Sequence, residues 1–254
     1  MADTVIEVEN LSKRFGGVVA VERMDFAVKR GSTTALLGAN GAGKSTTISM
    51  LLGLLLPTTG TITVLGEDIL KHRHRVLARM NFTSPYVDLP HRLTVRENLV
   101  VFGRLYGVPR VKQRVAEIGE EMRISELMQR ATGSLSAGQK TRVALAKSLL
   151  NEPEVLLMDE PTASLDPDMA DVIRSYLEAY QRRTGATILL ASHNMAEVER
   201  LCSTVLMMKG GVIADRGTPA ELIARYGRKT LEEVFLTIVR RNGDELEGER
   251  KTGT

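Results

Sequence analysis

Apolar residues along this chain follow two spacings, and each predicts a different kind of strand. Apolar and polar residues alternate over 5–10 and, more loosely, over 18–28. This alternation predicts two antiparallel strands near the N-terminus, the first of them an edge strand. Unbroken apolar runs instead predict buried strands at 33–37, 155–158 and 186–191. Further strands are expected at 61–65, 205–208 and 211–214, the last two as a hairpin.

Helices are expected where apolar residues recur at helical spacing behind a capping signal. Thr94 followed by Glu97 forms a capping box, and Asp166 with Pro167 after it begins another helix. Between 66 and 92 the pattern is weak, and prolines exclude a long helix there. The expected helices are 46–56, a mostly helical region from about 94 to 131 whose second part is 111–130, 135–150, one from 166, 219–226 and 231–240. The tail from 241 to 254 is polar and is expected to be disordered.

The composition is that of an ordinary globular protein with enough apolar residues for a sizeable core. The chain has 254 residues, 43% of them hydrophobic and 26% charged. No run of eighteen apolar residues is present, so no membrane span is expected, and no secretory signal is visible. The single cysteine, Cys202, cannot form an internal disulfide, which agrees with a reducing compartment.

The net charge of +3 is mild, and the positive charge gathers in one basic cluster at 71–75. This cluster has two interpretations, a surface for anionic lipid or nucleic acid, or a solvated helix face. The second is favoured. No aromatic residue interrupts the cluster, which argues against a platform for stacking nucleic-acid bases. We therefore expect no nucleic-acid partner.

One glycine-rich loop stands between a predicted buried strand and a predicted helix. It consists of Gly38, Ala39, Asn40, Gly41, Ala42, Gly43, Lys44, Ser45 and Thr46. It matches the pattern G-x-x-x-x-G-K-[ST], in which glycines let backbone N–H groups turn inward around phosphates. In such a loop the lysine adds a positive charge for the β- and γ-phosphates, and the Ser45 hydroxyl ligates Mg²⁺. The loop therefore predicts a nucleotide site.

Polar residues follow two of the buried strands at their carboxyl ends. Asp159 and Glu160 follow the strand at 155–158, where one carboxylate can hold Mg²⁺ and the other can polarise a water. A solvated strand end is the alternative. His193 follows the strand at 186–191, where an imidazole can reach a phosphate or be an ordinary surface residue. Ser136 begins a helix with free N–H groups, which is a second candidate anion site.

Five motifs in order carry a resemblance to a known family. The stretches GANGAGKST, LSAGQ, VLLMDEP, ASLD and SHN resemble those of the ATP-binding subunit of an ABC transporter. The resemblance covers about 5–240, as one ATP-binding domain. It implies an α/β fold, a P-loop NTPase core with an N-terminal antiparallel β subdomain and a helical signature subdomain at about 83–150.

The resemblance also implies a role for each matching position. Phe15 stacks on adenine, Gly38 to Thr46 hold the phosphates, and Ser45 and Asp159 bind Mg²⁺. Glu160 is the general base and His193 the switch histidine. The signature residues Ser136, Ala137, Gly138 and Gln139 contact the ATP that the opposite subunit holds, and Asp166 links the two sites. The cofactors implied are ATP and Mg²⁺, and the partner subunit is a second copy or a different ATP-binding subunit.

Two positions depart from the family's pattern. The signature has Ala137 where the family usually has glycine, so a backbone with positive φ there would be strained at a modest cost. The family also places a glutamine near residue 82 that senses Mg²⁺ and contacts the membrane partner. Here the stretch is 81–86, without glutamine, and Thr83 or Ser84 is the nearest candidate. This departure puts Mg²⁺ sensing at that point in doubt.

The stretches 97–107 and 229–236 resemble those of ABC exporters whose polytopic membrane permease is a separate protein. We therefore expect an ATPase, peripheral on the cytoplasmic face of the membrane, that powers export. The alternatives are a soluble ABC-type ATPase in translation or cofactor assembly, and a nucleotide-binding switch. One face of the last helix carries Leu231, Val234, Phe235, Ile238 and Val239. This face either makes a dimer or regulatory contact or packs on its own domain.

Overall fold

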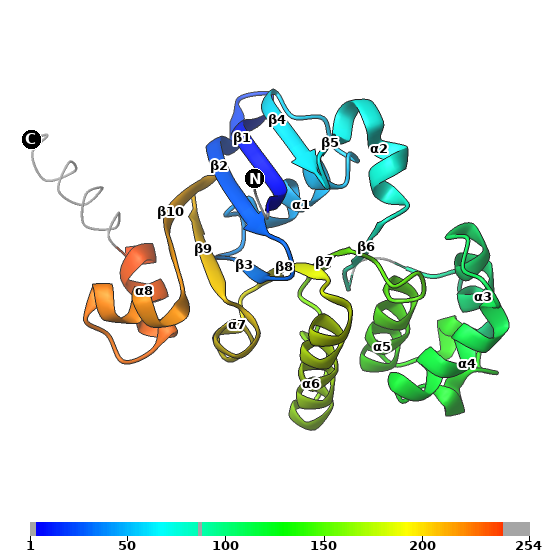
Figure 1. The fold of residues 1–254 in the computed structure, drawn as a ribbon. Coiled ribbons are helices and arrows are strands. Elements are labelled where there is room, and N and C mark those ends of the chain that lie inside the picture. Colours follow the sequence, from blue (N-terminus) through cyan, green and yellow to red (C-terminus); the bar gives the residue numbers. More distant parts are fainter. Residues whose placement is uncertain (1–3, 86–87, 241–254) are drawn as a thin grey trace, which may run out of the picture.

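Two β-sheets form the framework of the protein (Figure 1). The computed structural model describes residues 4–85 and 88–240. The smaller, antiparallel sheet contains, from one edge to the other, β2 (Val18–Lys29), β1 (Thr4–Phe15), β4 (Thr59–Val64) and β5 (Glu67–Asp68). The larger contains β10 (Val212–Gly217), β9 (Thr204–Lys209), β3 (Thr33–Gly38), β8 (Thr187–Ser192), β7 (Val155–Asp159) and β6 (Met80–Thr83).

The larger sheet is parallel except at β10, which pairs antiparallel with β9. Its inner strands β3, β7 and β8 are buried along their whole length. This is why they occur in the sequence as unbroken apolar runs rather than as an alternation. The three predictions of buried strands are confirmed, and so is the hairpin of β9 and β10. The carboxyl ends of β3, β7 and β8 meet at one edge of this sheet, because the strands are parallel.

The prediction that the first strand lies at an edge is wrong. β1 lies between β2 and β4, and Ile6 is opposite Val28 on one side and Val64 on the other. Val5, Ile6 and Val8 are buried. Alternation of apolar and polar residues reports that one face of a strand is covered. It does not report how many neighbours the strand has, and β4 arrives from a segment about fifty residues further along the chain.

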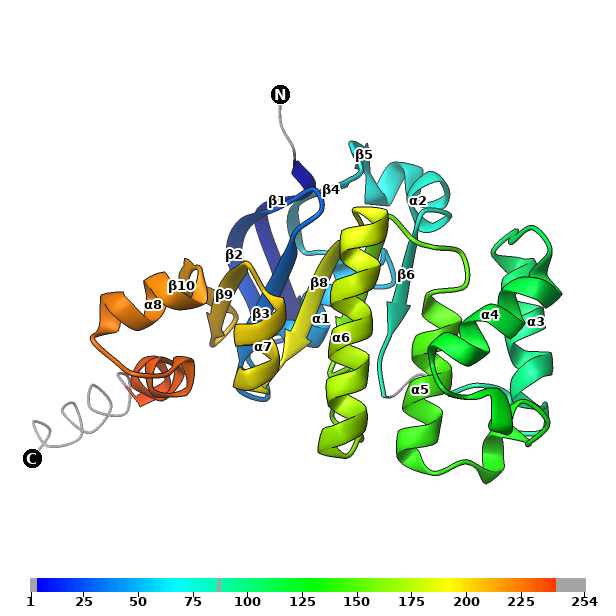
Figure 2. The same cartoon turned by 60° about the horizontal axis from the view of Figure 1, so that its bottom comes forward.

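Helices cover both faces of the larger sheet. They are α1 (Lys44–Leu51), α2 (Ile69–Leu77), α3 (Val95–Leu105), α4 (Val111–Glu121), α5 (Ala137–Ser148), α6 (Pro167–Thr184), α7 (Met195–Leu201), α8 (Pro219–Tyr226) and a last helix at 231–240. Helix α1 packs between the two sheets, in the core that β1, β2 and β4 share with β3. Helices α6 and α7 lie on the opposite face, while α3, α4 and α5 lie together at the β6 edge (Figures 1 and 2).

Capping signals in the sequence mark several helix starts correctly. Thr94 and Glu97 form the expected capping box, and the Asp166 carboxylate accepts from the Met169 N–H at 3.0 Å. Helix ends are less well predicted. α1 spans 44–51 rather than 46–56, because Gly43 in a left-handed conformation begins it and Gly53 follows its end. α4 ends at Glu121, nine residues before the predicted end, and a short 3₁₀ turn, Ser125–Leu127, follows.

The stretch between 66 and 92 contains a helix that the sequence pattern did not predict. Asp68 caps α2 by accepting from the N–H groups of Leu70 and Lys71. Only Ile69 and Val76 of this helix are buried, and the five positions from 71 to 75 are all polar, so few apolar residues mark the stretch as a helix. The basic cluster at 71–75 lies on its solvent-exposed face. The favoured interpretation, a solvated helix face, agrees with this placement.

The apolar face of the last helix packs on its own chain. Leu231 and Val234 are fully buried and Ile238 nearly so. The Lys209 ammonium donates to the carbonyls of Ile238 and Val239 at the helix end. Packing on its own domain therefore accounts for Leu231, Val234 and Ile238, whereas Val239 of the same face is 37% exposed. The tail at 241–254 lies outside the described residues. No helix within the described ranges is long and apolar enough to cross a bilayer.

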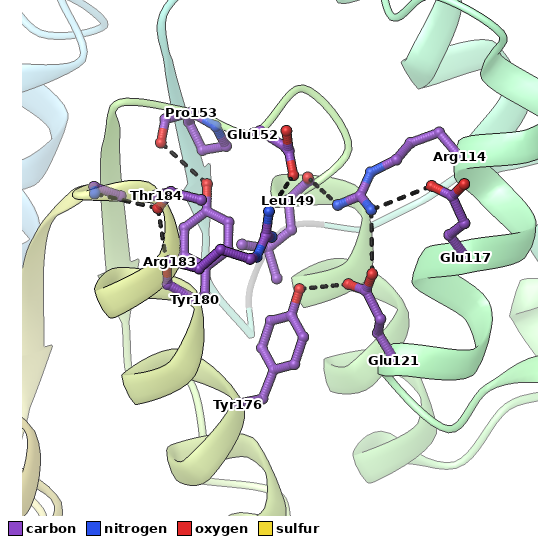
Figure 3. A network of polar contacts seen from close by, with 11 residues as sticks. Arg114, Glu117, Glu121, Leu149, Glu152, Pro153, Tyr176, Tyr180, Arg183 and Thr184 are labelled. Carbon is purple, nitrogen blue, oxygen red and sulfur yellow. Dashed lines mark hydrogen bonds and ion pairs between the residues drawn. The ribbon is translucent and has the colours of Figure 1, made fainter.

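A polar network joins the helices at the β6 edge to the core (Figure 3). The Tyr176 hydroxyl on α6 donates to the Glu121 carboxylate on α4 at 2.6 Å. Arg114 on α4 lies 3.3 Å from Glu121 and donates to the Leu149 carbonyl, which follows α5, at 3.2 Å. The Arg114 side chain is 12% exposed, whereas the Glu121 side chain is 34% exposed, so the network lies at the border between packed helices and solvent. The network therefore ties α4 to both α5 and α6.

Candidate functional site

The glycine-rich loop connects β3 to α1 and forms one wall of an open pocket. Two of its glycines are required by close approach to the neighbouring backbone. A Cβ on Gly38 would lie 2.7 Å from the Met208 carbonyl, and one on Gly43 would lie 2.6 Å from the Ala20 carbonyl. Gly43 also has a φ of 101°. The pocket measures about 330 Å³ and is lined by Val18, Val19, Ala20 and residues 40–46.

Lys44 begins α1 and turns its side chain back into the loop. Its ammonium donates to the Gly38 carbonyl at 2.6 Å and to the Ala39 carbonyl at 3.2 Å, and the residue is 7% exposed. Burial lowers the pKa of Lys44, while the nearby carboxylates of Glu160 and Asp159 oppose this shift. The loop therefore holds a buried positive charge, which favours an anionic phosphate chain, and the two carboxylates beside it favour a cation.

Ser45 and Asp159 meet at the base of the pocket. The Ser45 hydroxyl donates to the Asp159 carboxylate at 3.0 Å. Burial raises the pKa of Asp159, and the bond from Ser45 and the charge of Lys44 oppose the shift. The described part of the chain contains no cluster of three or more His, Cys, Asp or Glu side chains placed to hold a metal. Mg²⁺, however, takes oxygen ligands and commonly uses one or two protein groups with water and substrate phosphate, so this pair fits it.

Glu160 and His193 are brought together from the ends of two neighbouring strands. Glu160 follows β7 and His193 follows β8, and their carboxylate oxygen and Nδ1 lie 2.6 Å apart. The Glu160 N–H donates to the Ala191 carbonyl at 2.8 Å, and its φ is 50°, which is uncommon for a residue with a side chain. The Glu160 side chain is 16% exposed. The parallel pairing of β7 and β8 thus creates an acid–imidazole pair beside the loop.

The signature residues lie on a different part of the molecule. Ser136 caps α5: its hydroxyl accepts from the Gln139 N–H, and its own N–H donates to the Gln139 side-chain oxygen. None of the residues 136–139 lines the pocket of the glycine-rich loop. In both views α5 lies beside α3 and α4, away from α1 (Figures 1 and 2). Ala137 is the first residue of α5 and does not have a positive φ, so the expected strain does not arise there.

Phe15 and Asp166 are placed by local structure. Phe15 ends β1 opposite Val18, a lining residue of the pocket, and its ring is 49% exposed. The Lys13 ammonium lies 5.0 Å from the ring centroid. The pocket that the loop lines therefore has an aromatic ring at its margin. Asp166 uses its carboxylate to cap α6 and does not line this pocket.

The stretch that lacks the family's glutamine ends β6. Thr83 is opposite Met158, one residue before Asp159, and both Thr83 and Ser84 are only 5% exposed. Next to this strand lies Lys147 of α5, which the sequence did not single out. Its ammonium donates to the Phe82 carbonyl at 3.2 Å and lies 5.6 Å from the Phe102 ring centroid. A lysine among small and apolar residues of a helix is the signal that would have found it.

Comparison with known proteins gives one family and several relatives. The family model described as "ABC transporter" matches residues 21–163. The chain is 38% identical to Nod factor export ATP-binding protein I of Ralstonia nicotianae, over 95% of this chain and 74% of that protein. It is 36% identical to the protein of the same name from Cupriavidus metallidurans, over 98% of this chain and 80% of the relative.

Solved structures share the fold. One described as the ATP-binding subunit of an ABC transporter has a TM-score of 0.85 and 27% identity, over 92% of this chain and 99% of that one. CbiO1 from Clostridium perfringens, described as part of the ABC transporter complex cbiONQ, has a TM-score of 0.77 and 32% identity. That match covers 88% of this chain and 92% of CbiO1. The shared fold includes both sheets, because the matches cover most of the chain.

Proposed function

This chain belongs to the ABC transporter family as an ATP-binding, ATP-hydrolysing subunit, and we propose that it powers export through a separate membrane permease. The observation that carries the proposal is the meeting of three groups at one sheet edge. Lys44 lies inside the glycine-rich loop, the Ser45–Asp159 pair lies at its base, and Glu160 contacts His193. Such a set serves positioning and charge neutralisation, which are what phosphoryl transfer to water needs.

The loop binds the triphosphate. Backbone N–H groups of Gly38 to Thr46 and the Lys44 ammonium bind its anionic oxygens, and Lys44 gives up its contacts to the loop carbonyls on binding. Ser45 and Asp159 would hold Mg²⁺, which would supply positive charge to neutralise the phosphates. The half-exposed Phe15 ring at the pocket margin stacks on adenine, as the resemblance implies.

Glu160 acts on the attacking water. Its carboxylate orients the water and accepts its proton, and His193 fixes the direction of that carboxylate through their 2.6 Å contact. Lys44 stabilises the charge that develops on the phosphate oxygens. The low exposure of Glu160 supports this role, because few bulk waters can compete with the attacking water for its carboxylate.

A second ATP-binding subunit completes the site. Residues 136–139 form a capped helix start whose N–H groups suit an anion, yet they lie away from the pocket of their own chain. Their place on the surface supports a pairing in which each chain's signature contacts the ATP held by the other. The partner is a second copy of this chain or a related subunit.

The names of the relatives support the direction of transport. Nod factor export ATP-binding protein I is named for export, and CbiO1 is described as part of a transporter complex. We place this chain on the cytoplasmic face of the membrane, bound to a polytopic permease.

The test of the site is the ATP-dependent association of Glu160→Gln. This change keeps the shape of the side chain and removes the base, so closed complexes should accumulate instead of being hydrolysed. Light scattering after size exclusion should show a monomer without nucleotide and a dimer with Mg-ATP. Lys44→Ala in the same background is the matched control and should stay monomeric. A Glu160→Gln protein that hydrolyses ATP at the wild-type rate would show that Glu160 is not the base.

A further inference from the structure

A buried carboxylate lies directly behind the Glu160–His193 pair. It belongs to Glu197 in α7, and the residue is 1% exposed. Its Oε1 accepts from the Thr162 hydroxyl at 2.8 Å, and its Oε2 accepts from the Ser192 hydroxyl at 2.7 Å. Each carboxylate oxygen therefore holds one hydroxyl, and these hydroxyls come from two different segments of the chain.

The two hydroxyls belong to the segments that carry the pair. Thr162 lies two residues after Glu160, and Ser192 directly precedes His193. Both are buried, Thr162 at 5% exposure and Ser192 at 0%. Because neither residue is far from its catalytic neighbour, a shift of either hydroxyl moves the backbone that carries the carboxylate or the imidazole. Glu197 is the side chain that bridges them.

The start of α7 fixes Glu197 in turn. The Asn194 N–H donates to the Ser192 hydroxyl at 3.0 Å, and the Asn194 side chain accepts from the Glu197 N–H at 3.2 Å. The Ser192 hydroxyl thus donates a hydrogen bond to Glu197 and accepts one from the Asn194 N–H. The bonds close a ring through Ser192, Asn194 and Glu197, so the loop with His193 has little freedom to move independently.

A buried acid of this kind is costly unless its oxygens are bonded. Burial raises the pKa of Glu197, and the bonds from Ser192 and Thr162 oppose that shift. Of the charged groups that face it, Glu160 disfavours the ionised carboxylate and Arg174 of α6 favours it. An apolar residue would fill the same space in α7 without this cost, so its position between the two segments calls for a role beyond packing.

We propose that Glu197 is a positioning residue that holds the Glu160 carboxylate and the His193 imidazole in register for hydrolysis. The proposal rests on the function assigned above to Glu160. Glu197 acts through Thr162 and Ser192, whereas Lys44 bonds to carbonyls of its own loop. Loss of Glu197 should therefore slow the chemical step and leave ATP affinity nearly unchanged.

Three variants of the full chain test this role. Glu197→Ala should lower kcat by about tenfold to a hundredfold, the scale expected when reacting groups are displaced by about 1 Å, with little change in KM for ATP. Glu197→Gln keeps the size and a carbonyl acceptor, and should restore most of the rate. Glu199→Ala is the matched control on the same helix. Glu199 accepts from the Leu231 N–H at 2.9 Å, so its loss should lower thermal stability and leave kcat unchanged.

A second readout does not depend on hydrolysis. The chain has four histidines, so the imidazole signals can be followed by NMR and that of His193 assigned with His193→Gln. The His193 signal should move in Glu197→Ala and stay in place in Glu199→Ala. The inference is overturned if Glu197→Ala leaves kcat and this signal unchanged, or if kcat and ATP affinity fall together. If the wild-type chain, assembled with its partner subunit and permease, hydrolyses no ATP, the proposed function fails, while the NMR comparison still decides the role of Glu197.

Discussion

At the scale of single residues, the site is governed by charges held out of water. Lys44, Asp159 and Glu160 lie within electrostatic reach of one another, and burial shifts the pKa of Lys44 down and that of Asp159 up. Each shift arises because burial disfavours the charged form of the side chain. A bound triphosphate with its cation would satisfy both charges. The site is therefore built for a ligand more than for stability.

Replacing Lys44 by Ala should weaken ATP binding. The ammonium would make charge-assisted hydrogen bonds to phosphate, so its loss should cost about 2 kcal/mol, or about thirtyfold in Kd. Calorimetric titration with a non-hydrolysable ATP analogue measures this directly. Lys71→Ala, on the solvent-exposed face of α2, is the control of equal charge change. Wild-type affinity in Lys44→Ala would mean that the loop has been assigned the wrong ligand.

Lys147 should make the free energy of unfolding depend on pH in the alkaline range. Burial lowers the pKa of Lys147 from 10.5 to about 8. Between these values the unfolded chain binds this proton and the folded chain does not, so the free energy of unfolding rises with pH. The stability of the folded chain with an uncharged Lys147 is fully present above pH 10.5. It is lost as the pH falls through about 8, where the buried lysine must take up a proton.

Urea unfolding of the wild type and of Lys147→Met at pH 8 and pH 9.5 measures this effect. The difference between the two proteins cancels the titration of other groups. The wild type should gain roughly 1 kcal/mol relative to the variant over this range. Parallel changes in both proteins would show that Lys147 keeps its proton in the folded state, stabilised by Phe82 and Phe102.

At the scale of elements, helix caps and interhelical bonds position the signature. α5 begins at a capping box, and α4 bonds to the Leu149 carbonyl just beyond the end of α5 through Arg114. Tyr176 of α6 then bonds to α4 through Glu121 (Figure 3). A movement of α5 would therefore have to break these bonds or move α4 and α6 with it. These bonds fix the far end of α5, and the capping box fixes its start on the surface.

The capping residues Ser136 and Thr94 allow stability to be separated from function. Each accepts from a backbone N–H of its helix within a capping box, so Ser136→Ala and Thr94→Ala should each cost about 1 kcal/mol of stability. Only Ser136→Ala should also weaken ATP-driven dimerisation of Glu160→Gln, measured by light scattering. Equal dimerisation in both variants would argue that α5 does not contact the partner's ATP.

At the scale of the whole molecule, the fold separates the two halves of the proposed site. The phosphate loop lies between the sheets, and the signature lies with the helices at the β6 edge. Within one chain, the signature residues 136–139 thus do not line the pocket of the glycine-rich loop. This arrangement makes assembly a condition of full activity, and it is the reason to look for partners.

Purification from detergent-solubilised membranes of the source cells tests the permease. A tagged chain should retain a polytopic membrane protein through washing, because the proposed transporter is a stable assembly. Recovery with ribosomal or cofactor-assembly proteins, and no membrane protein, would favour the soluble alternative.

The sequence alone determined the local features of this protein. Unbroken apolar runs marked β3, β7 and β8, Thr94 with Glu97 marked the start of α3, and the pattern of the glycine-rich loop marked the turn between β3 and α1. These features depend on residues a few positions apart, whose preferences act before the chain folds. The order of five motifs was enough to identify the family.

Only the tertiary structure decided which distant residues meet. The inner position of β1, the 2.6 Å contact of Glu160 with His193, and the burial of Lys147 and Glu197 each join segments about thirty or more residues apart, or depend on the packing of several elements. A carboxylate or an ammonium looks the same in a sequence whether it faces water or the core. Its surroundings arise from the topology of the sheets, and its pKa and its role follow from those surroundings.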